Sequence, residues 1–185
     1  MKYKIAVSGG ASIENVPTDA IVLARQIGKE IARQGCILIT GATTGMPLLA
    51  AQGAKEEKGI SIGFSPAYSE LSHIRSLKLP TDFFDVIVYT GFGYSGRNLL
   101  MTRAADGVIV ISGRMGTLNE FTIAFEDKKP IGVLEGSGGT ADRIRSLTKG
   151  PLRQKPKIVY SHDPRELVEG LIKLIKKEKK KGNNV

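Results

Sequence analysis

Short apolar runs and longer amphipathic segments alternate along the whole chain. Each apolar run is continuous and rich in Val and Ile, a pattern typical of strands buried on both faces of a parallel sheet. Seven such strands are expected, at residues 4–7, 36–40, 60–64, 86–90, 108–111, 131–134 and 158–160.

The segments between these runs carry helix signals. Residues 19–33 place apolar side chains at helical spacing, and Gly35 follows where a helix commonly ends. Further helices are expected over residues 46–57, from 91–96 through about residue 105, over 121–127, after residue 139 and from about residue 164. Residues 65–82 are expected to form a long irregular connection. The alternation predicts an α/β protein, a single doubly wound Rossmann-like domain with a mainly parallel sheet of about seven strands. We expect it to span residues 1–175, with 176–185 as a basic, frayed tail.

Glycine-rich loops follow five of the expected strands, at residues 8–12, 41–45, 91–96, 112–117 and 135–139. Glycine lets a ligand approach the backbone closely, and the N-terminus of a following helix suits phosphate. One such loop is an ordinary turn, but five at one edge of a sheet predict a nucleotide-sized, phosphate-bearing ligand. The residues expected to bind it in three of these loops are Ser8, Gly9, Gly10, Gly41, Thr43, Thr44, Gly45, Gly113, Arg114, Met115, Gly116 and Thr117.

Two of these loops resemble better-known nucleotide motifs, but one lacks the context of its motif and the other lacks part of the motif itself. The sequence GFGYSG at 91–96 fits the dinucleotide pattern, but it follows the fourth expected strand and has no acidic residue at the proper distance. The sequence GATTG at 41–45 lacks the Lys-Ser/Thr ending of a P-loop. Neither NAD binding nor P-loop NTP hydrolysis is therefore expected.

The net charge of +9 is concentrated at one end of the chain. Residues 171–181 hold six lysines and one glutamate, which supply +5 of the total. This segment has no aromatic residues for base stacking, so we expect no nucleic-acid partner. No apolar run approaches the length of a membrane span, and the N-terminal stretch reads as a strand rather than a secretory signal, so no membrane partner is expected.

Cysteine and histidine are scarce. The single Cys36 lies inside an apolar run and suits a reducing cytoplasm, where we expect the protein to reside. His73 and His162 have no second ligand at metal-binding spacing, so no metal site is expected.

The segment SGRMGTLNE at 112–120 raises the question of what Glu120 does. Thr117 and Glu120 are spaced as a capping box, which predicts that Glu120 ties down the first turn of a helix. The alternative is that its carboxylate faces a bound ligand and takes part in chemistry.

Three motifs together resemble the LOG-like, Rossmann-fold nucleotide-binding superfamily: GATTGMPLLAAQGA, GRNLLMTRAADGVIVISGRMGTLNE and KKPIGVL. This superfamily includes cytokinin-activating phosphoribohydrolases, formerly called lysine decarboxylases, and molybdenum cofactor carrier proteins. The resemblance covers roughly residues 4–135. The hydrolase signature is Arg-Lys-x-x-Met followed by Pro-Gly-Gly-x-Gly-Thr-x-x-Glu. Here Asn98 replaces its Lys, Ser112 its Pro and Arg114 its middle Gly, while Arg97 and Met101 are kept.

The resemblance implies that Arg97 and Glu120 are a catalytic pair and that the Gly-Thr turn holds a 5′-phosphate, with Met101 beside it. It implies a phosphoribohydrolase that cleaves a purine nucleoside 5′-monophosphate, of cytokinin or AMP type, to base and ribose 5-phosphate. A carboxylate near the sugar suits such chemistry because its transition state resembles an oxocarbenium ion.

The departures leave a second function open, a non-catalytic carrier or sensor that binds a nucleotide or a phosphorylated, pterin-type cofactor. Whether the protein is an enzyme is undecided at this point. Neither function requires a resident cofactor, and the partner is a small phosphate-bearing molecule. The resemblance also implies a homo-oligomer, a dimer or tetramer.

Overall fold

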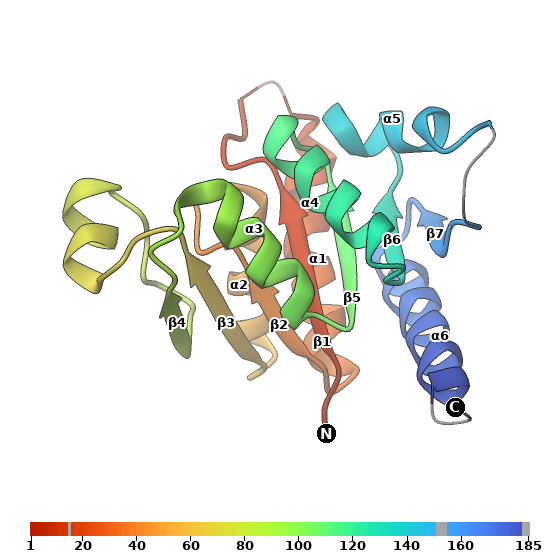
Figure 1. Cartoon of the computed structure of the whole chain (residues 1–185), viewed down its shortest axis with the longest axis horizontal. Helices are drawn as coiled ribbons and strands as arrows, with labels where there is room; N and C mark the ends of the chain where they lie inside the picture. The colour runs from red at the N-terminus through yellow and green to blue at the C-terminus, as the bar shows by residue number, and fades with distance from the viewer. Residues whose placement is uncertain (15, 151–154, 183–185) are drawn as a thin grey trace.

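Seven strands form one parallel sheet in the computed structural model, which describes residues 1–14, 16–150 and 155–182. The strands are β1 (Lys4–Gly9), β2 (Ile37–Thr40), β3 (Ile60–Ser65), β4 (Val86–Tyr89), β5 (Gly107–Ile111), β6 (Ile131–Leu134) and β7 (Ile158–Ser161). Their order in the sheet is β4-β3-β2-β1-β5-β6-β7, and every neighbouring pair is parallel (Figure 1). The predicted fold class is confirmed.

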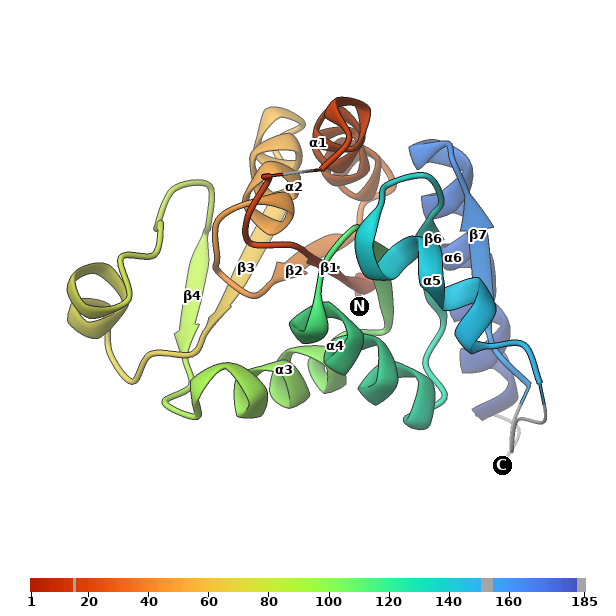
Figure 2. The ribbon, with the colours of Figure 1, turned by 90° about the horizontal axis from the view of Figure 1, so that it is seen from above.

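Among the described residues, six α-helices cover the two faces of the sheet, which Figure 2 shows from above. One layer holds α1 (Thr18–Arg33), α2 (Met46–Glu56) and α6 (Pro164–Gly182). The other holds α3 (Gly93–Ala104), α4 (Met115–Glu126) and α5 (Gly139–Leu147). This is the doubly wound arrangement in which ligands bind at the carboxyl edge of the sheet.

The central strands are mainly apolar because they bury side chains on both faces. In β1, Ile5 and Val7 pack into the core under α1, α2 and α6, whereas Ala6 packs into the core under α3, α4 and α5. In β5, Ile109 and Val110 divide between the two cores in the same way. A strand buried on both faces has no polar positions to alternate with, which explains the continuous runs in the sequence.

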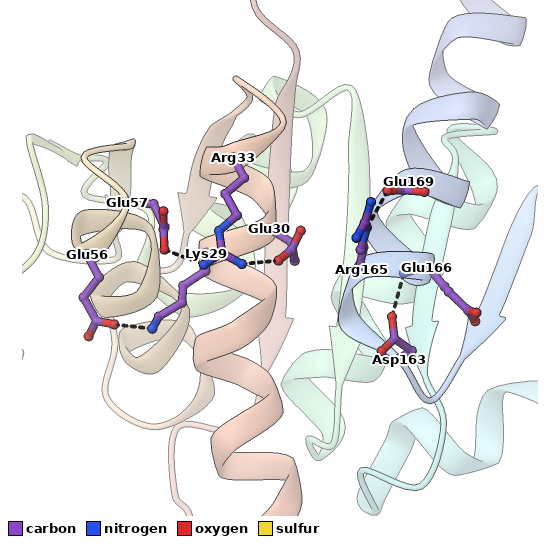
Figure 3. Close-up of polar contacts among 9 residues, drawn as sticks. All are labelled: Lys29, Glu30, Arg33, Glu56, Glu57, Asp163, Arg165, Glu166 and Glu169. Atoms are coloured by element: carbon purple, nitrogen blue, oxygen red, sulfur yellow. Dashed lines mark hydrogen bonds and ion pairs between the residues drawn. The ribbon is translucent and has the colours of Figure 1, made fainter.

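Helices α1 and α2 approach each other unusually closely. A Cβ atom at Gly28 would lie 1.9 Å from the Ala50 carbonyl oxygen, and one at Gly53 would lie 1.9 Å from the Arg25 carbonyl oxygen. Surface ion pairs join the same two helices, including Lys29–Glu56 at 2.9 Å and Arg33–Glu57 at 2.7 Å (Figure 3). Side chains at either glycine would force the helices apart.

The connection between β3 and β4, predicted to be irregular, contains a π-helix (Ser72–Ser76). His73 within it is fully buried and fastens the segment at two points. Its Nδ1 lies 2.8 Å from Ser65 Oγ, and its Nε2 lies 2.9 Å from the Pro80 carbonyl oxygen. Since the carbonyl can only accept, Nε2 carries a proton and donates it to the Pro80 carbonyl oxygen. His73 therefore holds this segment in place.

Helix α6 continues past residue 175 to Gly182, so most of the lysine-rich segment is helical; residues 183–185 of the predicted tail lie outside the described residues. Two side chains in this extension contact the body of the protein. Glu178 pairs with Lys157 at 2.5 Å, and Lys179 pairs with Asp106 at 2.9 Å. Within the part of the chain that the structure describes, no helix is long and apolar enough to cross a membrane.

Candidate functional site

A cavity of about 350 Å³ opens at the carboxyl ends of β1, β2 and β5. The chain builds β1 to β4 outward in one direction and then returns to place β5 on the other side of β1. The cavity thus lies at the point where the strand order reverses, the usual ligand site in such sheets. Nine of the residues expected at the site line it: Gly9, Gly10, Gly41, Thr43, Arg97, Arg114, Gly116, Thr117 and Glu120.

Four other expected residues do not line this cavity, and three of them pack within or between the loops. Thr44 donates its hydroxyl to the Ala11 carbonyl oxygen at 2.7 Å and so ties the second loop to the first. Gly45, with φ of +74°, sits against the Gly10 carbonyl, where a Cβ would come within 2.2 Å of the oxygen. Gly113, with φ of +93°, packs against Thr117 in the same manner, and Met115 is largely exposed at the start of α4.

The cavity also includes six residues that were not among the expected catalytic or ligand-binding residues: Val7, Ala11, Ser12, Pro47, Tyr94 and Asn98. Asn98 follows Arg97 directly in the motif, which was the available signal for it. Tyr94 lies in the GFGYSG segment, which was interpreted only as a possible dinucleotide motif. Ser12, next to Gly10 in the first loop, is a further hydroxyl at the cavity wall.

The capping-box prediction for Glu120 is wrong. Helix α4 begins at Met115, three residues earlier than a cap at Thr117 would allow, and Arg114 at its N-cap makes no side-chain cap bond. Glu120 is therefore the sixth residue of the helix, beyond the reach of the first turn. It is buried, with 6% of its surface exposed, and its carboxylate points to partners on other elements.

Three elements supply hydrogen-bond donors to the Glu120 carboxylate. Ser8, at the end of β1, donates its hydroxyl to Oε2. Arg97 of α3 donates from Nη1 to Oε1 across 3.4 Å. The Asn98 amide, oriented so that donors face acceptors, donates to the same Oε1 at 2.9 Å and to the Tyr94 carbonyl oxygen at 3.0 Å. Both carboxylate oxygens are therefore engaged by the protein itself.

Burial dominates the electrostatics of this cluster. It raises the pKa of Glu120 above its ordinary value, against the opposing effects of the Arg97 charge and the Ser8 hydrogen bond. It lowers the pKa of Arg97, which the negative charge of Glu120 opposes. Removing each ion from water costs free energy, and the attraction between the two charges offsets part of that cost.

Arg97 reaches Glu120 by lying across the backbone of the second loop. A Cβ at Gly41 would lie 1.7 Å from Arg97 Nη1, so only glycine leaves room for the guanidinium there. Met101, one turn further along α3 and fully buried, places its sulfur 3.7 Å from the same nitrogen. Arg97 Nε is buried without a hydrogen-bond partner among the described residues. The packing fixes Arg97 more tightly than its ion pair alone would.

The opposite wall of the cavity suits an anion. Gly116 and Thr117 are the second and third residues of α4, and the first N–H groups of a helix have no acceptor within it. A Cβ at Gly116 would meet nothing within 4 Å, so the backbone is open to the cavity there. Arg114 adds an exposed cation beside this helix start. Together the N–H groups, the helix dipole and Arg114 form a phosphate-sized anion site.

A second cavity, of about 330 Å³, lies between α1 and the start of α6 and has a different character. Its cations Lys29, Arg33 and Arg165 are each paired with a glutamate of α1, α2 or α6 (Figure 3). Such a surface network leaves little charge for a ligand. Across residues 1–14, 16–150 and 155–182, no three His, Cys, Asp or Glu side chains lie close enough together to hold a metal ion.

Comparison with known proteins places this geometry in context. A model of the SLOG cluster4 family matches residues 2–168 of the chain. The solved structure of TM1055 has 26% identity and a TM-score of 0.82, and the match covers 94% of this chain and 99% of that one.

Two further solved structures are similar over nearly their whole length. The molybdenum cofactor binding protein of the phototrophic bacterium Rippkaea orientalis is 28% identical, with 96% of this chain and 97% of that chain covered and a TM-score of 0.73. The molybdenum cofactor carrier protein of Chlamydomonas reinhardtii is 26% identical, with 95% and 99% covered and a TM-score of 0.75.

Proposed function

The chain belongs to the SLOG cluster4 family, and from that premise we propose that it is a carrier that binds a phosphorylated, pterin-type cofactor and releases it unchanged. The similar proteins of Rippkaea orientalis and Chlamydomonas reinhardtii are described as binding or carrying the molybdenum cofactor. The ligand would be cargo, with its phosphate at the start of α4 and Arg114, and its ring system toward Tyr94 and Pro47.

The observation that carries this proposal is the engagement of Glu120. Its two carboxylate oxygens accept hydrogen bonds from Ser8, Arg97 and Asn98, and only 8% of its side chain is exposed. An ionised carboxylate has about four acceptor positions, so these three hydrogen bonds leave roughly one for a water or a sugar. A carrier needs only that the walls of the cavity be held in place, and the buried cluster does this by joining β1, α3 and α4.

The residues of the cavity suit a phosphorylated heterocycle without a resident metal or cofactor. Unpaired N–H groups of α4 and the Arg114 guanidinium match a phosphate. Ser12, Thr43 and the exposed ring of Tyr94 offer hydroxyl groups and an aromatic face to a ring with hydrogen-bonding edges. A cavity of about 350 Å³ is within the range of small-molecule sites.

The test uses purified full-length protein with a phosphorylated pterin and a panel of nucleoside monophosphates. We expect the pterin to raise the melting temperature by mass action, with no free base released from any nucleotide in chromatography. Arg114→Ala should weaken pterin binding about ten-fold, because a charge-assisted hydrogen bond is worth about 1.5 kcal/mol. Arg143→Ala, an exposed arginine of α5 away from the cavity, is the matched control. Equal affinities for the two variants would contradict the phosphate position.

A phosphoribohydrolase is the second candidate, favoured by the buried pairing of Arg97 with Glu120 at 3.4 Å beside the anion site. This function predicts base release from a purine nucleoside monophosphate. It also predicts a loss of about 10²-fold or more in Glu120→Gln, since the lost charge would have stabilised an oxocarbenium-like transition state. Base release with that sensitivity would replace the carrier proposal with the enzyme.

A further inference from the structure

A further cavity, of about 380 Å³, adjoins the cavity that contains Glu120, at the carboxyl ends of the neighbouring strands β1, β5 and β6 (Figure 1). We call the two the adjoining cavity and the cofactor cavity. They share the lining residues Gly10, Ser12 and Arg114. The remaining lining residues of the adjoining cavity are Glu14, Val16, Ser112, Gly113 and Gly139. Because Arg114 lines both cavities, a group bound to its guanidinium lies at their common border.

The adjoining cavity accounts for sequence features that the cofactor cavity leaves unused. Of the five glycine-rich loops, the one at 135–139, which the structure describes in full, contributes no residue to the cofactor cavity. Through Gly139 it lines the adjoining cavity. The two departures from the second part of the hydrolase signature, Ser112 and Arg114, line this cavity as well. The positions at which the chain differs from that signature therefore lie together.

The backbone holds Ser112 in a conformation that few side chains adopt. Its φ is +50°, in the left-handed region that glycine favours. Its N–H donates to Ser137 Oγ at 2.8 Å, and its carbonyl oxygen accepts from the Ala141 N–H at 3.0 Å. Proline, which the hydrolase signature has at this position, is fixed at a φ of about −65° and cannot take this conformation. The serine therefore allows the β5 loop a shape that the signature does not.

The Ser112 hydroxyl has an unused capacity for hydrogen bonding. Ser112 is buried, with 4% of its surface exposed, and within the described part of the chain its Oγ has no hydrogen-bond partner. A buried hydroxyl group without a partner costs free energy, so most such groups are hydrogen-bonded. Since Ser112 lines the adjoining cavity, a molecule bound there would supply the partner.

The floor of the adjoining cavity is preformed by backbone contacts between the β5 and β6 loops. A Cβ atom at Gly139 would lie 2.3 Å from the Gly113 carbonyl oxygen, so the two chains touch there. The same oxygen accepts from the Thr140 N–H at 2.9 Å. A cavity whose walls are already in place loses little conformational entropy when it binds a ligand.

The side chains of the adjoining cavity suit a sugar. Glu14 contributes a carboxylate, and Ser12 and Ser112 contribute hydroxyl groups. A carboxylate that accepts hydrogen bonds from hydroxyl groups is the usual partner of a ribose in doubly wound folds. The same carboxylate disfavours a second anion beside it. None of the described residues that line this cavity is aromatic, so it offers no stacking surface to a base.

We propose that the adjoining cavity binds a sugar that is joined to the phosphate of the ligand in the cofactor cavity. This inference rests on the proposed function, because it extends the same ligand. The phosphate lies beside Arg114 at the border of the two cavities. The ring system then extends toward Tyr94 on one side, and the sugar toward Ser112 and Glu14 on the other. The cargo is therefore a sugar ester of a phosphorylated pterin rather than the phosphorylated pterin alone.

Calorimetric titration of the full-length protein with two probes tests the proposal: a pterin diphosphate, and the same diphosphate esterified to ribose. We expect the wild type to bind the ribose ester about ten-fold more tightly, the gain from one hydrogen bond to a charged group. Ser112→Gly and Glu14→Gln should each lose most of this preference and keep the wild-type affinity for the diphosphate without ribose. Glycine removes the hydroxyl group and adopts a φ of +50° without strain, so Ser112→Gly should fold.

Two matched controls should keep the preference for the ribose ester. Glu126→Gln removes an exposed carboxylate of α4, and Lys128→Gly replaces another residue with a positive φ, of +55°. Equal affinity of the wild type for the two probes would overturn the inference and leave cofactor binding standing. So would Ser112→Gly and Glu14→Gln proteins that keep the full preference, or that lose affinity for both probes alike. If neither these probes nor a pterin monophosphate bind, the proposed function fails together with this inference.

Discussion

Replacing Gly41 by alanine tests whether Arg97 is positioned by the backbone beneath it. Gly41 does not have a positive φ, so alanine is free of backbone strain there and any effect comes from the contact with Arg97. The new Cβ would lie 1.7 Å from Nη1, and ordinary contact begins at 3.4 Å. The guanidinium must therefore retreat by roughly 2 Å. That shift is comparable with the 3.4 Å that separates Nη1 from Glu120 Oε1, so the pair is disrupted.

The expected cost follows from what the displacement leaves behind. Removing one partner of a buried ion pair costs about 3–5 kcal/mol, because the other charge stays buried and unpaired. Here Arg97 is displaced rather than deleted, and Ser8 and Asn98 remain on the Glu120 carboxylate. We therefore expect a loss of about 2 kcal/mol in the free energy of unfolding, or about 4–8 °C in melting temperature for a chain of this size.

Gly116→Ala provides the contrast. A Cβ at Gly116 meets no protein atom within 4 Å, so this variant should keep the wild-type melting temperature. It should lose ligand affinity, because the new methyl group enters the cavity where a phosphate would approach α4. The assay is thermal unfolding of both variants, with and without a phosphorylated pterin. Unfolding of Gly41→Ala at the wild-type temperature would refute the positioning of Arg97 by Gly41.

Three further predictions concern the same cluster and the end of α6. Asn98→Asp should lower the melting temperature by several degrees, since it sets a second carboxyl group 2.9 Å from Glu120 Oε1, whereas Gln26→Glu on the exposed face of α1 should not, as thermal unfolding will show. Burial raises the pKa of Glu120 in the folded state, so the folded protein keeps this proton to higher pH than the unfolded chain. The free energy of unfolding, relative to that of Glu120→Gln, should therefore fall as pH rises above 4.5, the ordinary pKa of a glutamate. Urea titrations at several pH values measure this difference, and a difference that stayed constant or rose would contradict the prediction. Deleting the residues after Lys176 removes the Glu178 and Lys179 ion pairs, so it should lower the free energy of unfolding by about 1 kcal/mol. Cofactor binding, measured by calorimetry, should be unchanged. Loss of binding would show that the tail supports the site.

Much of the fold could be read from the chain because local and global requirements coincide. Strands such as β5 are buried on both faces, and their continuous Val and Ile runs indicate that burial. The segment around residues 72–76 could not be predicted in this way. Its π-helix depends on the His73 ring reaching Ser65 and the Pro80 carbonyl, contacts that no sequence period encodes.

The sequence named nine of the residues that line the cavity, but not the geometry that they adopt. Arg97 and Glu120 were identified through their motifs, and the structure brings them together. The capping-box prediction was wrong because α4 starts earlier, directly after Arg114 in an extended conformation. Thr117 lies within the helix and packs against Gly113. The amide of Asn98 on Glu120 could not be inferred, since it depends on how α3 and α4 lie side by side.

The contact of α1 with α2 through Gly28 and Gly53 has a consequence for the rate of ligand exchange. The loops at 9–12 and 41–45, which form one wall of the cavity, lead into these two helices, whose backbones touch and leave no room for sliding. The other wall is formed by α3 and α4, which contact each other through side chains, for example the ion pair of Arg103 with Asp127. The carrier proposal therefore predicts that opening for ligand release occurs on the α3–α4 side. Substitutions that loosen that contact should shorten the residence time of the ligand, while the α1–α2 wall stays preorganised for the next molecule.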